Sequence, residues 1–174
     1  QPELGNRVTF DMASELRQLC QRLNESGTAQ VVILTGSGQS FSFGGEQLLC
    51  NNDSSELPLD QRLESYRAAS SIGSLKMPSI AAINGDALNH GLELALACDL
   101  RIAARGIRLG MTQVHRGLIP WDGGTQRLPR LVGRARALML LLTARVLHTQ
   151  EALEIGLISD VVDIDESLLV YTVV

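Results

Sequence analysis

The sequence predicts an α/β fold, and three features of the chain lead to that prediction. Two short apolar runs, within 29–35 and 80–83, are continuous rather than alternating, as in strands that are buried on both faces of a parallel sheet. Segments with apolar residues at helical spacing precede and follow these runs. Glycine-containing turns separate the two kinds of segment. Such an alternation of buried strands and helices is typical of α/β architecture.

The first helix is expected to start after Thr9, whose side-chain oxygen can accept a hydrogen bond from the first turn. The apolar residues that share one face of this helix are Met12, Leu16, Leu19, Cys20 and Leu23. The turn residues at 26–28 end the helix, and 29–35 is expected to form a buried strand.

Residues 36–45 form a glycine-rich segment, which we interpret as a loop. It contains neither G-K-[ST] nor the spacing G-x-G-x-x-G, so the nucleotide-binding motifs fail here. A simple turn is an alternative interpretation of this segment. The polar residues 49–60 are expected to form a mobile surface segment, and the pattern over 61–75 predicts one helix that ends before Pro78.

The stretch 80–103 organises the rest of the chain. A strand at 80–83 meets the turn Asn84-Gly85, a second loop follows at 89–91, and an apolar helix is expected over 92–97 before another strand. The first N–H groups of a helix point outward with a partial positive charge, so this loop can hold a developing oxyanion. Glu93 lies in the first turn, where a carboxylate can also simply complement the helix dipole. Farther on, we expect a short strand at 106–110 and helices at 135–142 and 149–155.

Composition narrows the class of protein. The length of 174 residues with 45% hydrophobic residues favours one domain over 1–174. The net charge is −4 without a cluster of Lys or Arg, which argues against nucleic-acid binding. No apolar run is long enough to span a bilayer, so we expect no membrane association. The three widely spaced cysteines and dispersed histidines match neither a disulfide framework nor a metal site. Reduced thiols indicate an intracellular protein, cytoplasmic or, in a eukaryote, in the mitochondrial matrix.

Three motifs resemble the crotonase (enoyl-CoA hydratase/isomerase) family. The pattern N-G-x-A-x-x-G-G-x-E-L-A-x-x-C-D is matched by Asn84, Gly85, Ala87, Gly91, Glu93, Leu94, Ala95, Cys98 and Asp99. The loop F-[CS]-x-G-[AG]-D is matched by Phe41, Ser42, Gly44 and Gly45, with Glu46 in place of the Asp. Residues 111–133 resemble the signature that ends in G-G-T-Q-R-L. The resemblance covers about 1–163 and implies the family's spiral of ββα units.

The resemblance also implies a function. In this family two backbone N–H groups bind a thioester oxygen, and they correspond here to those of Gly45 and His90. Two glutamates activate water in the hydratases; the first corresponds to Glu93, whereas the second falls on Gln113. An amide can orient water but cannot take a proton near neutral pH, so Gln113 weakens the hydratase expectation and, more strongly, the isomerase one.

Further residues are candidates for the same site. Asp122 replaces a small residue and can act as an acid; alternatively, it only binds nearby backbone N–H groups. His90 replaces a glycine, and its side chain either takes part in acid–base chemistry or points away. His115 can line the site, whereas His148 is expected at the surface. The resemblance further implies contacts to substrate and coenzyme A, and the residues expected to make them are Asn6, Arg7, Val8, Phe43, Gly44, Glu46, Gln47 and Trp121.

Three functional hypotheses follow. The first is a lyase of fatty-acid metabolism that acts on an acyl-CoA substrate without a further cofactor. The second is a crotonase-fold hydrolase that cleaves a C–C bond of a β-diketone with Asp122 and a histidine. The third is a catalytically impaired scaffold. By resemblance we expect the full-length protein to form a homotrimer or hexamer, and this sequence to lack the family's first strand and its C-terminal helices.

Overall fold

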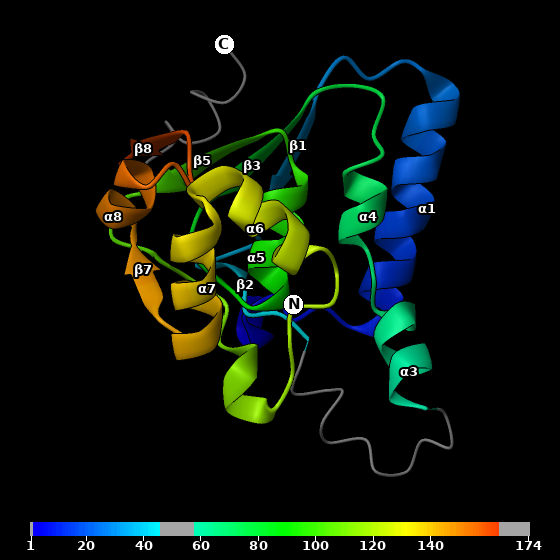
Figure 1. Ribbon diagram of the computed structural model, residues 1–174. Coiled ribbons are helices and arrows are strands. Elements are labelled where there is room, and N and C mark those ends of the chain that lie inside the picture. The colour runs from blue at the N-terminus through cyan, green and yellow to red at the C-terminus, as the bar shows by residue number, and fades with distance from the viewer. Residues whose placement is uncertain (1, 46–57, 164–174) are drawn as a thin grey trace.

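The computed structural model of the chain describes residues 2–45 and 58–163. The surface segment expected at 49–60 therefore lies largely outside the described residues, as do Glu46 and Gln47. The described residues form seven α-helices and two four-stranded sheets, with one helix, α5 (His90–Ala97), at the centre of the molecule (Figure 1).

The strands form two four-stranded sheets. The first sheet has the order β1-β3-β5-β8 and consists of Val32–Thr35, Ser79–Ile83, Leu100–Ala104 and Asp160–Val162. The second has the order β2-β4-β6-β7 and consists of Ser40–Ser42, Asp86–Leu88, Arg108–Gly110 and Val146–His148. All pairings are parallel except that of β6 with β7. From β1 to β6, successive strands thus alternate between the two sheets, and helices follow β2, β4 and β6. This arrangement confirms the predicted α/β spiral of ββα units.

The helices are α1 (Phe10–Ser26), α3 (Leu59–Ser65), α4 (Ala69–Ile72), α5 (His90–Ala97), α6 (Gly124–Val132), α7 (Arg134–Thr143) and α8 (Thr149–Glu154). Two 3₁₀ turns add Pro2–Leu4 and Gln113–Arg116. The expected start of α1 is confirmed, because the Thr9 hydroxyl accepts a hydrogen bond from the N–H of Met12. Gly27 ends α1 in the left-handed conformation, with φ at 62°.

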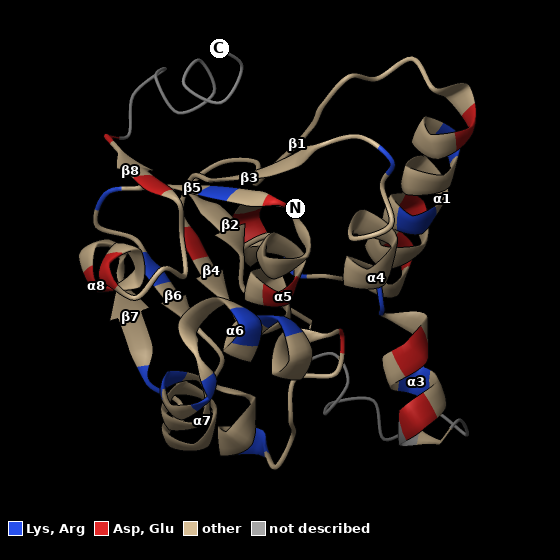
Figure 2. Ribbon diagram, turned by 45° about the horizontal axis from the view of Figure 1, so that its top comes forward, with Lys and Arg blue, Asp and Glu red and all other residues tan. Residues whose placement is uncertain are grey.

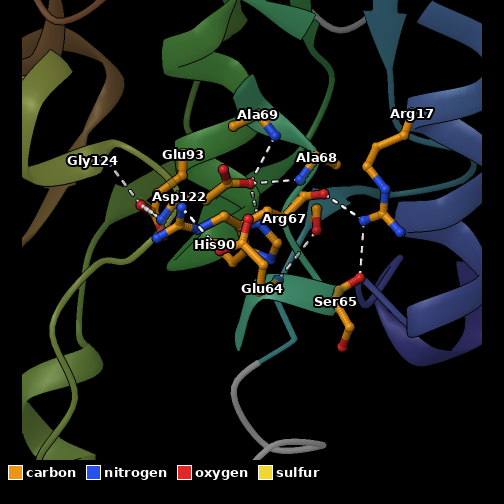
Figure 3. Close-up of polar contacts among 12 residues, drawn as sticks. Arg17, Glu64, Ser65, Arg67, Ala68, Ala69, His90, Glu93, Asp122 and Gly124 are labelled. Atoms are coloured by element: carbon orange, nitrogen blue, oxygen red, sulfur yellow. Dashed lines mark hydrogen bonds and ion pairs between the residues drawn. The ribbon is translucent and has the colours of Figure 1, made fainter. Parts of the chain in front are cut away.

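The single helix predicted over 61–75 is wrong. The chain forms α3 and α4 instead, with a break at 66–68. Arg17 of α1 donates to the carbonyls of Ser65 and Arg67, at 2.9 and 2.6 Å, and a distant carboxylate takes the N–H groups of Ala68 and Ala69 (Figure 3). These backbone groups are therefore unavailable for a continuous helix.

Two other expectations need correction. The strand predicted at 29–35 is shorter, and it is only partly buried because β1 lies at the edge of its sheet. The glycine-rich segment 36–45 is not only a loop, since it contains β2. By contrast, β3 is buried along its whole length, as its continuous apolar run predicted.

The central helix α5 is buried at every residue, and it packs against α4, α6, β2 and β4. Its apolar residues belong to the main core, so packing from all sides, rather than one amphipathic face, holds it in place. Two polar side chains of α5, His90 and Glu93, are buried with it. Buried polar groups need hydrogen-bond partners, and these partners define the site described below.

The close approach of α5 to β2 predicts a large effect at Gly91. A Cβ atom there would lie 2.2 Å from the carbonyl oxygen of Ser42, so Gly91→Ala is expected to lower the free energy of unfolding by about 3 kcal/mol. Urea unfolding of the variant measures this loss. Gly73→Ala is the control, because its Cβ would meet the flexible end of Arg127 at 3.2 Å, and the expected change is within about 1 kcal/mol. Equal stability of Gly91→Ala and wild type would contradict the packing.

Candidate active site

The two backbone segments with the candidate oxyanion donors meet at one edge of the second sheet. Ser42 of β2 pairs with Ala87 of β4 in a parallel register. Gly45 and His90 each follow their paired position by three residues, and the carboxyl ends of parallel strands lie at the same edge of a sheet. His90 is also the first residue of α5, where backbone N–H groups point out of the helix. The register therefore places Gly45 and His90 at the same edge of the second sheet, and their role as a pair of oxyanion donors stays a prediction.

The first of these segments requires glycine at two positions. A Cβ atom on Gly45 would lie 2.4 Å from the carbonyl oxygen of Val8. The preceding residue, Gly44, has φ at 79°, and its N–H donates to the Ser42 hydroxyl at 3.2 Å. Glycine is needed at both positions, at one for conformation and at the other for close packing.

Glu93 is fully buried, and its carboxylate faces the start of α6 (Figure 3). The Oε1 atom accepts the N–H of Asp122 at 2.9 Å and that of Gly124, the first residue of α6, at 2.8 Å. The Oε2 atom lies 3.5 Å from Nε2 of Gln113. The side chain thus reaches across to another helix instead of only complementing the dipole of its own.

Burial raises the pKa of Glu93 from 4.5 to about 7, although His90 and the N–H of Gly124 act in the opposite direction. A carboxyl group with a pKa near neutrality can both accept and release a proton at physiological pH. Glu93 therefore has the properties of a general acid or base.

Asp122 and His90 form a buried pair. Oδ2 of Asp122 lies 2.9 Å from Nε2 of His90 and accepts the N–H groups of Ala68 and Ala69, each at 2.7 Å (Figure 3). Burial by itself would raise the pKa of Asp122, but the hydrogen bonds from His90, Ala69 and Ala68 outweigh it, so that this pKa lies below its usual value. Asp122 does bind backbone N–H groups, as one of the two interpretations of its sequence position predicted. These groups are not nearby in the sequence, however, but more than fifty residues away.

Five of the residues expected in the site lie together: His90, Glu93, Gln113, Trp121 and Asp122. The rings of His90 and Trp121 are 5.1 Å apart, so Trp121 forms a wall beside the Asp122–His90 pair. The four polar side chains expose 3% of their surface or less.

Other expected site residues lie apart from this cluster. The side chain of Asn6 donates to the carbonyls of Ser37 and Ser40, so it braces the first loop. Val8 is fully buried, while Arg7 and Phe43 are half-buried. Contacts of these residues with coenzyme A stay predictions. His115 is exposed on its 3₁₀ turn, and His148 is exposed, as predicted.

Sequence reasoning missed the residues that support the site. Arg127 donates to the backbone carbonyl of Asp122 at 2.7 Å. The N–H groups of Ala68 and Ala69 donate to the Asp122 carboxylate. Arg127 belongs to the G-G-T-Q-R-L segment, and this motif was the one feature of the sequence that could have indicated a role for Arg127 in the site. Nothing in the sequence near Ala68 indicated a contact with Asp122, because the two are distant along the chain.

We also searched the described residues for a metal-binding cluster, for a membrane-spanning helix and for a basic surface. Within 2–45 and 58–163, no three His, Cys, Asp or Glu side chains gather in a way that could hold a metal ion. In the same part of the chain, no helix combines the length and the hydropathy needed to cross a membrane. Lys and Arg are scattered over several elements rather than gathered on one face (Figure 2).

The buried carboxyl group predicts how stability depends on pH. In the unfolded chain Glu93 titrates near 4.5, and in the folded chain near 7, so the folded state binds this proton more tightly. The stabilising contribution is complete below pH 4.5 and is lost as the pH rises through 7. Between about pH 5 and pH 8 the wild type is expected to lose roughly 2–3 kcal/mol more than Glu93→Gln. Urea unfolding of both proteins measures the difference, and parallel pH profiles would contradict it.

Comparison with known proteins places the chain in a family. The sequence matches the enoyl-CoA hydratase/isomerase family profile over residues 1–173. It is 42% identical over 164 residues to a Bacillus subtilis protein described as putative enoyl-CoA hydratase/isomerase YngF, a match that covers 92% of this chain and 62% of the relative. It is 38% identical over 168 residues to crotonyl-CoA hydratase of Syntrophomonas wolfei, covering 96% of this chain and 65% of that protein. The chain thus spans less than two thirds of the length of these two relatives.

Solved structures agree with the sequence comparison. The crystal structure of an enoyl-CoA hydratase from Bacillus anthracis matches with a TM-score of 0.89 at 37% identity, over 99% of this chain and 67% of the other. A putative enoyl-CoA hydratase from Thermobifida fusca, solved in complex with CoA, matches with a TM-score of 0.87 at 33% identity, over 99% of this chain and 69% of the other. The spiral fold expected from the motifs is the fold of these proteins.

Proposed function

Because this chain belongs to the enoyl-CoA hydratase/isomerase family, we propose that it provides the catalytic core of a lyase that adds water to, or removes it from, a 2,3-enoyl-CoA thioester. The observation that carries the proposal is Glu93, a buried carboxyl group with a pKa of about 7 on the same helix as His90, whose N–H we propose as an oxyanion donor together with that of Gly45. Its combination of proton affinity and position suits acid–base chemistry next to a polarised carbonyl.

In the proposed hydration, the thioester oxygen accepts hydrogen bonds from the N–H groups of Gly45 and His90. This contact withdraws electrons from the double bond and stabilises the enolate that forms. Glu93 takes a proton from water as the water oxygen bonds to C3. The same proton, or one exchanged for it on the carboxyl group, is then delivered to C2, so that the thioester is restored and one molecule of water has been added.

Gln113 would orient the attacking water. Its Nε2 atom lies 3.5 Å from the Glu93 carboxylate, and its buried Oε1 atom has no hydrogen-bond partner in the described structure, so it is available to accept from water. Because an amide does not titrate, Glu93 must serve in turn as base and as acid. The absence of a second acid at Gln113 favours hydration over double-bond isomerisation.

The substrate assignment extends from the family. The Thermobifida neighbour is described in complex with CoA, and we propose that this chain also binds a CoA thioester, with the contacts predicted above. The chemistry assigned to Glu93 needs no further cofactor. Assembly of the full-length protein into a homotrimer or hexamer, and a cytoplasmic or mitochondrial location, belong to the same proposal.

The test is turnover of the full-length protein with a panel of enoyl-CoA thioesters and CoA-free β-diketones, followed by mass spectrometry. Gain of one water by an enoyl-CoA, with loss of its conjugated absorbance, is the expected result. No change in any thioester, despite measurable CoA binding, would refute the hydratase proposal. Failure to bind CoA and to turn over either class would favour the scaffold hypothesis.

A specific observation favours a second candidate function, the hydrolysis of a C–C bond in a β-diketone. The Asp122–His90 pair is buried and joined at 2.9 Å, an arrangement that can orient an imidazole as a base. In that reaction water adds to a carbonyl, the bond to the neighbouring carbon breaks, and the enolate leaves as a carboxylic acid forms. Cleavage of a diketone that survives Glu93→Gln and is lost in Asp122→Asn would select this function over hydration.

A further inference from the structure

The residue before His90 has an unusual backbone conformation. Asn89 has φ at 56° and ψ at −126°. Within the described residues only Asn6, Asn89 and Ala144 have positive φ without being glycine. Such a conformation costs about 1–3 kcal/mol and persists where the surroundings enforce it. It therefore calls for an account of what holds it and what it achieves.

Three hydrogen bonds hold Asn89 against the strand end after β6. Its side-chain Oδ1 accepts the N–H of Thr112 at 2.7 Å and the Thr112 hydroxyl at 2.9 Å. Its own N–H donates to the carbonyl of Gly110 at 2.7 Å, which extends the pairing of β4 with β6 by one step. We name the two hydrogen bonds between Thr112 and the Asn89 side chain the Asn89–Thr112 clamp.

The clamp acts on both sides of the proposed reaction centre. The ψ angle of Asn89 sets the plane of its peptide bond to His90, and so the direction of the His90 N–H. On the other side, Thr112 immediately precedes Gln113, whose side chain lies 3.5 Å from the Glu93 carboxylate. The clamp thus connects a proposed oxyanion donor to the group proposed to orient water.

We propose that Asn89 and Thr112 are positioning residues, whose clamp fixes the direction of the His90 N–H relative to Gln113 and Glu93. The inference rests on the proposed hydratase function. Its energetic basis is preorganisation: a hydrogen-bond donor held in place needs no reorientation as negative charge develops on the thioester oxygen. A turn that served stability alone would not affect the polarisation of a bound thioester.

The test uses Asn89→Gly in the full-length protein, because glycine accepts the backbone conformation without strain but cannot form the clamp. We expect kcat to fall about 10- to 100-fold while KM changes less than threefold. The absorbance maximum of a bound conjugated enoyl-CoA, which shifts to longer wavelength when the thioester carbonyl is polarised, is expected to move back toward its value in water. Thr112→Val, which removes only the hydroxyl bond, should give a smaller effect of the same kind.

Two controls make the outcome decisive. Thr112→Ser retains both donors of the clamp, and its kcat should stay within twofold of wild type. Asn89→Asp retains the Oδ1 acceptor but lacks the side-chain amide, so this variant shows whether loss of the clamp or loss of the amide group lowers kcat. Wild-type kcat and an unchanged spectral shift in Asn89→Gly would overturn the clamp alone. Absence of hydration by the wild type would overturn the proposed function, and this inference with it.

Discussion

Glu93→Gln is expected to lower kcat for hydration by about 10³- to 10⁴-fold, at the upper end of what one general acid–base group contributes. The expectation is large because the proposed mechanism routes both proton transfers through this carboxyl group. The neighbouring Gln113 cannot replace it, since an amide neither gains nor loses a proton near neutral pH.

The substitution separates chemistry from folding. A glutamine carbonyl can accept the N–H groups of Asp122 and Gly124 in place of Oε1, so the buried hydrogen bonds are kept. The measurement is the rate at which the conjugated absorbance of an enoyl-CoA disappears. Glu154→Gln, on the surface of α8, is the matched control and should leave kcat unchanged. If Glu93→Gln keeps more than a tenth of wild-type kcat, the acid–base assignment is wrong.

The acid–base assignment also agrees with the contrast between two neighbouring carboxyl groups. For Glu93, burial outweighs two backbone hydrogen bonds and the nearby His90, and its pKa rises to about 7. Asp122 is buried as well, but three hydrogen bonds converge on its Oδ2 atom, and its pKa falls. Environments that separate the pKa values of nearby acids assign them different roles. Here Glu93 is suited to exchange protons, and Asp122 to remain charged and hold His90.

The sequence was sufficient to predict those helices and strands that are stabilised by local interactions or are buried along their whole length. The spacing of apolar residues and the Thr9 cap predicted α1, and the continuous run at 80–83 predicted β3. The pattern over 61–75 misled, because hydrogen bonds from Arg17 and to Asp122 break the helix at 66–68. Long-range contacts of this kind leave no periodic signal in the sequence.

The candidate site was predictable to a similar extent. The resemblance to the family's motifs identified Glu93, Gln113, His90 and Asp122 one at a time. It could not show that His90 and Asp122, thirty-two residues apart, face each other, or that Oε1 of Glu93 accepts the N–H of Asp122. These relations depend on how α5 approaches the loop before α6, which is a property of packing rather than of spacing.

Asp122→Ala is expected to lower the free energy of unfolding by about 3–5 kcal/mol, the largest stability effect we predict. The truncation removes the acceptor for two buried backbone N–H groups, those of Ala68 and Ala69, and for Nε2 of His90. Each buried donor that loses its acceptor costs about 1–3 kcal/mol. Because these contacts hold the junction of α3 and α4, the same variant should expose that junction to faster amide hydrogen exchange.

Urea unfolding with hydrogen exchange at Ala68 and Ala69 measures both effects. Asp122→Asn keeps an oxygen that can accept the same three hydrogen bonds, so it should lose less than half as much stability as Asp122→Ala. Glu64→Ala is the control for loss of a carboxylate at the surface: its 3.1 Å pair with Arg67 is largely exposed, and the expected change is within about 0.5 kcal/mol. If Asp122→Ala is no less stable than Glu64→Ala, Asp122 does not hold the α3–α4 junction, and the break at 66–68 must come from Arg17 alone.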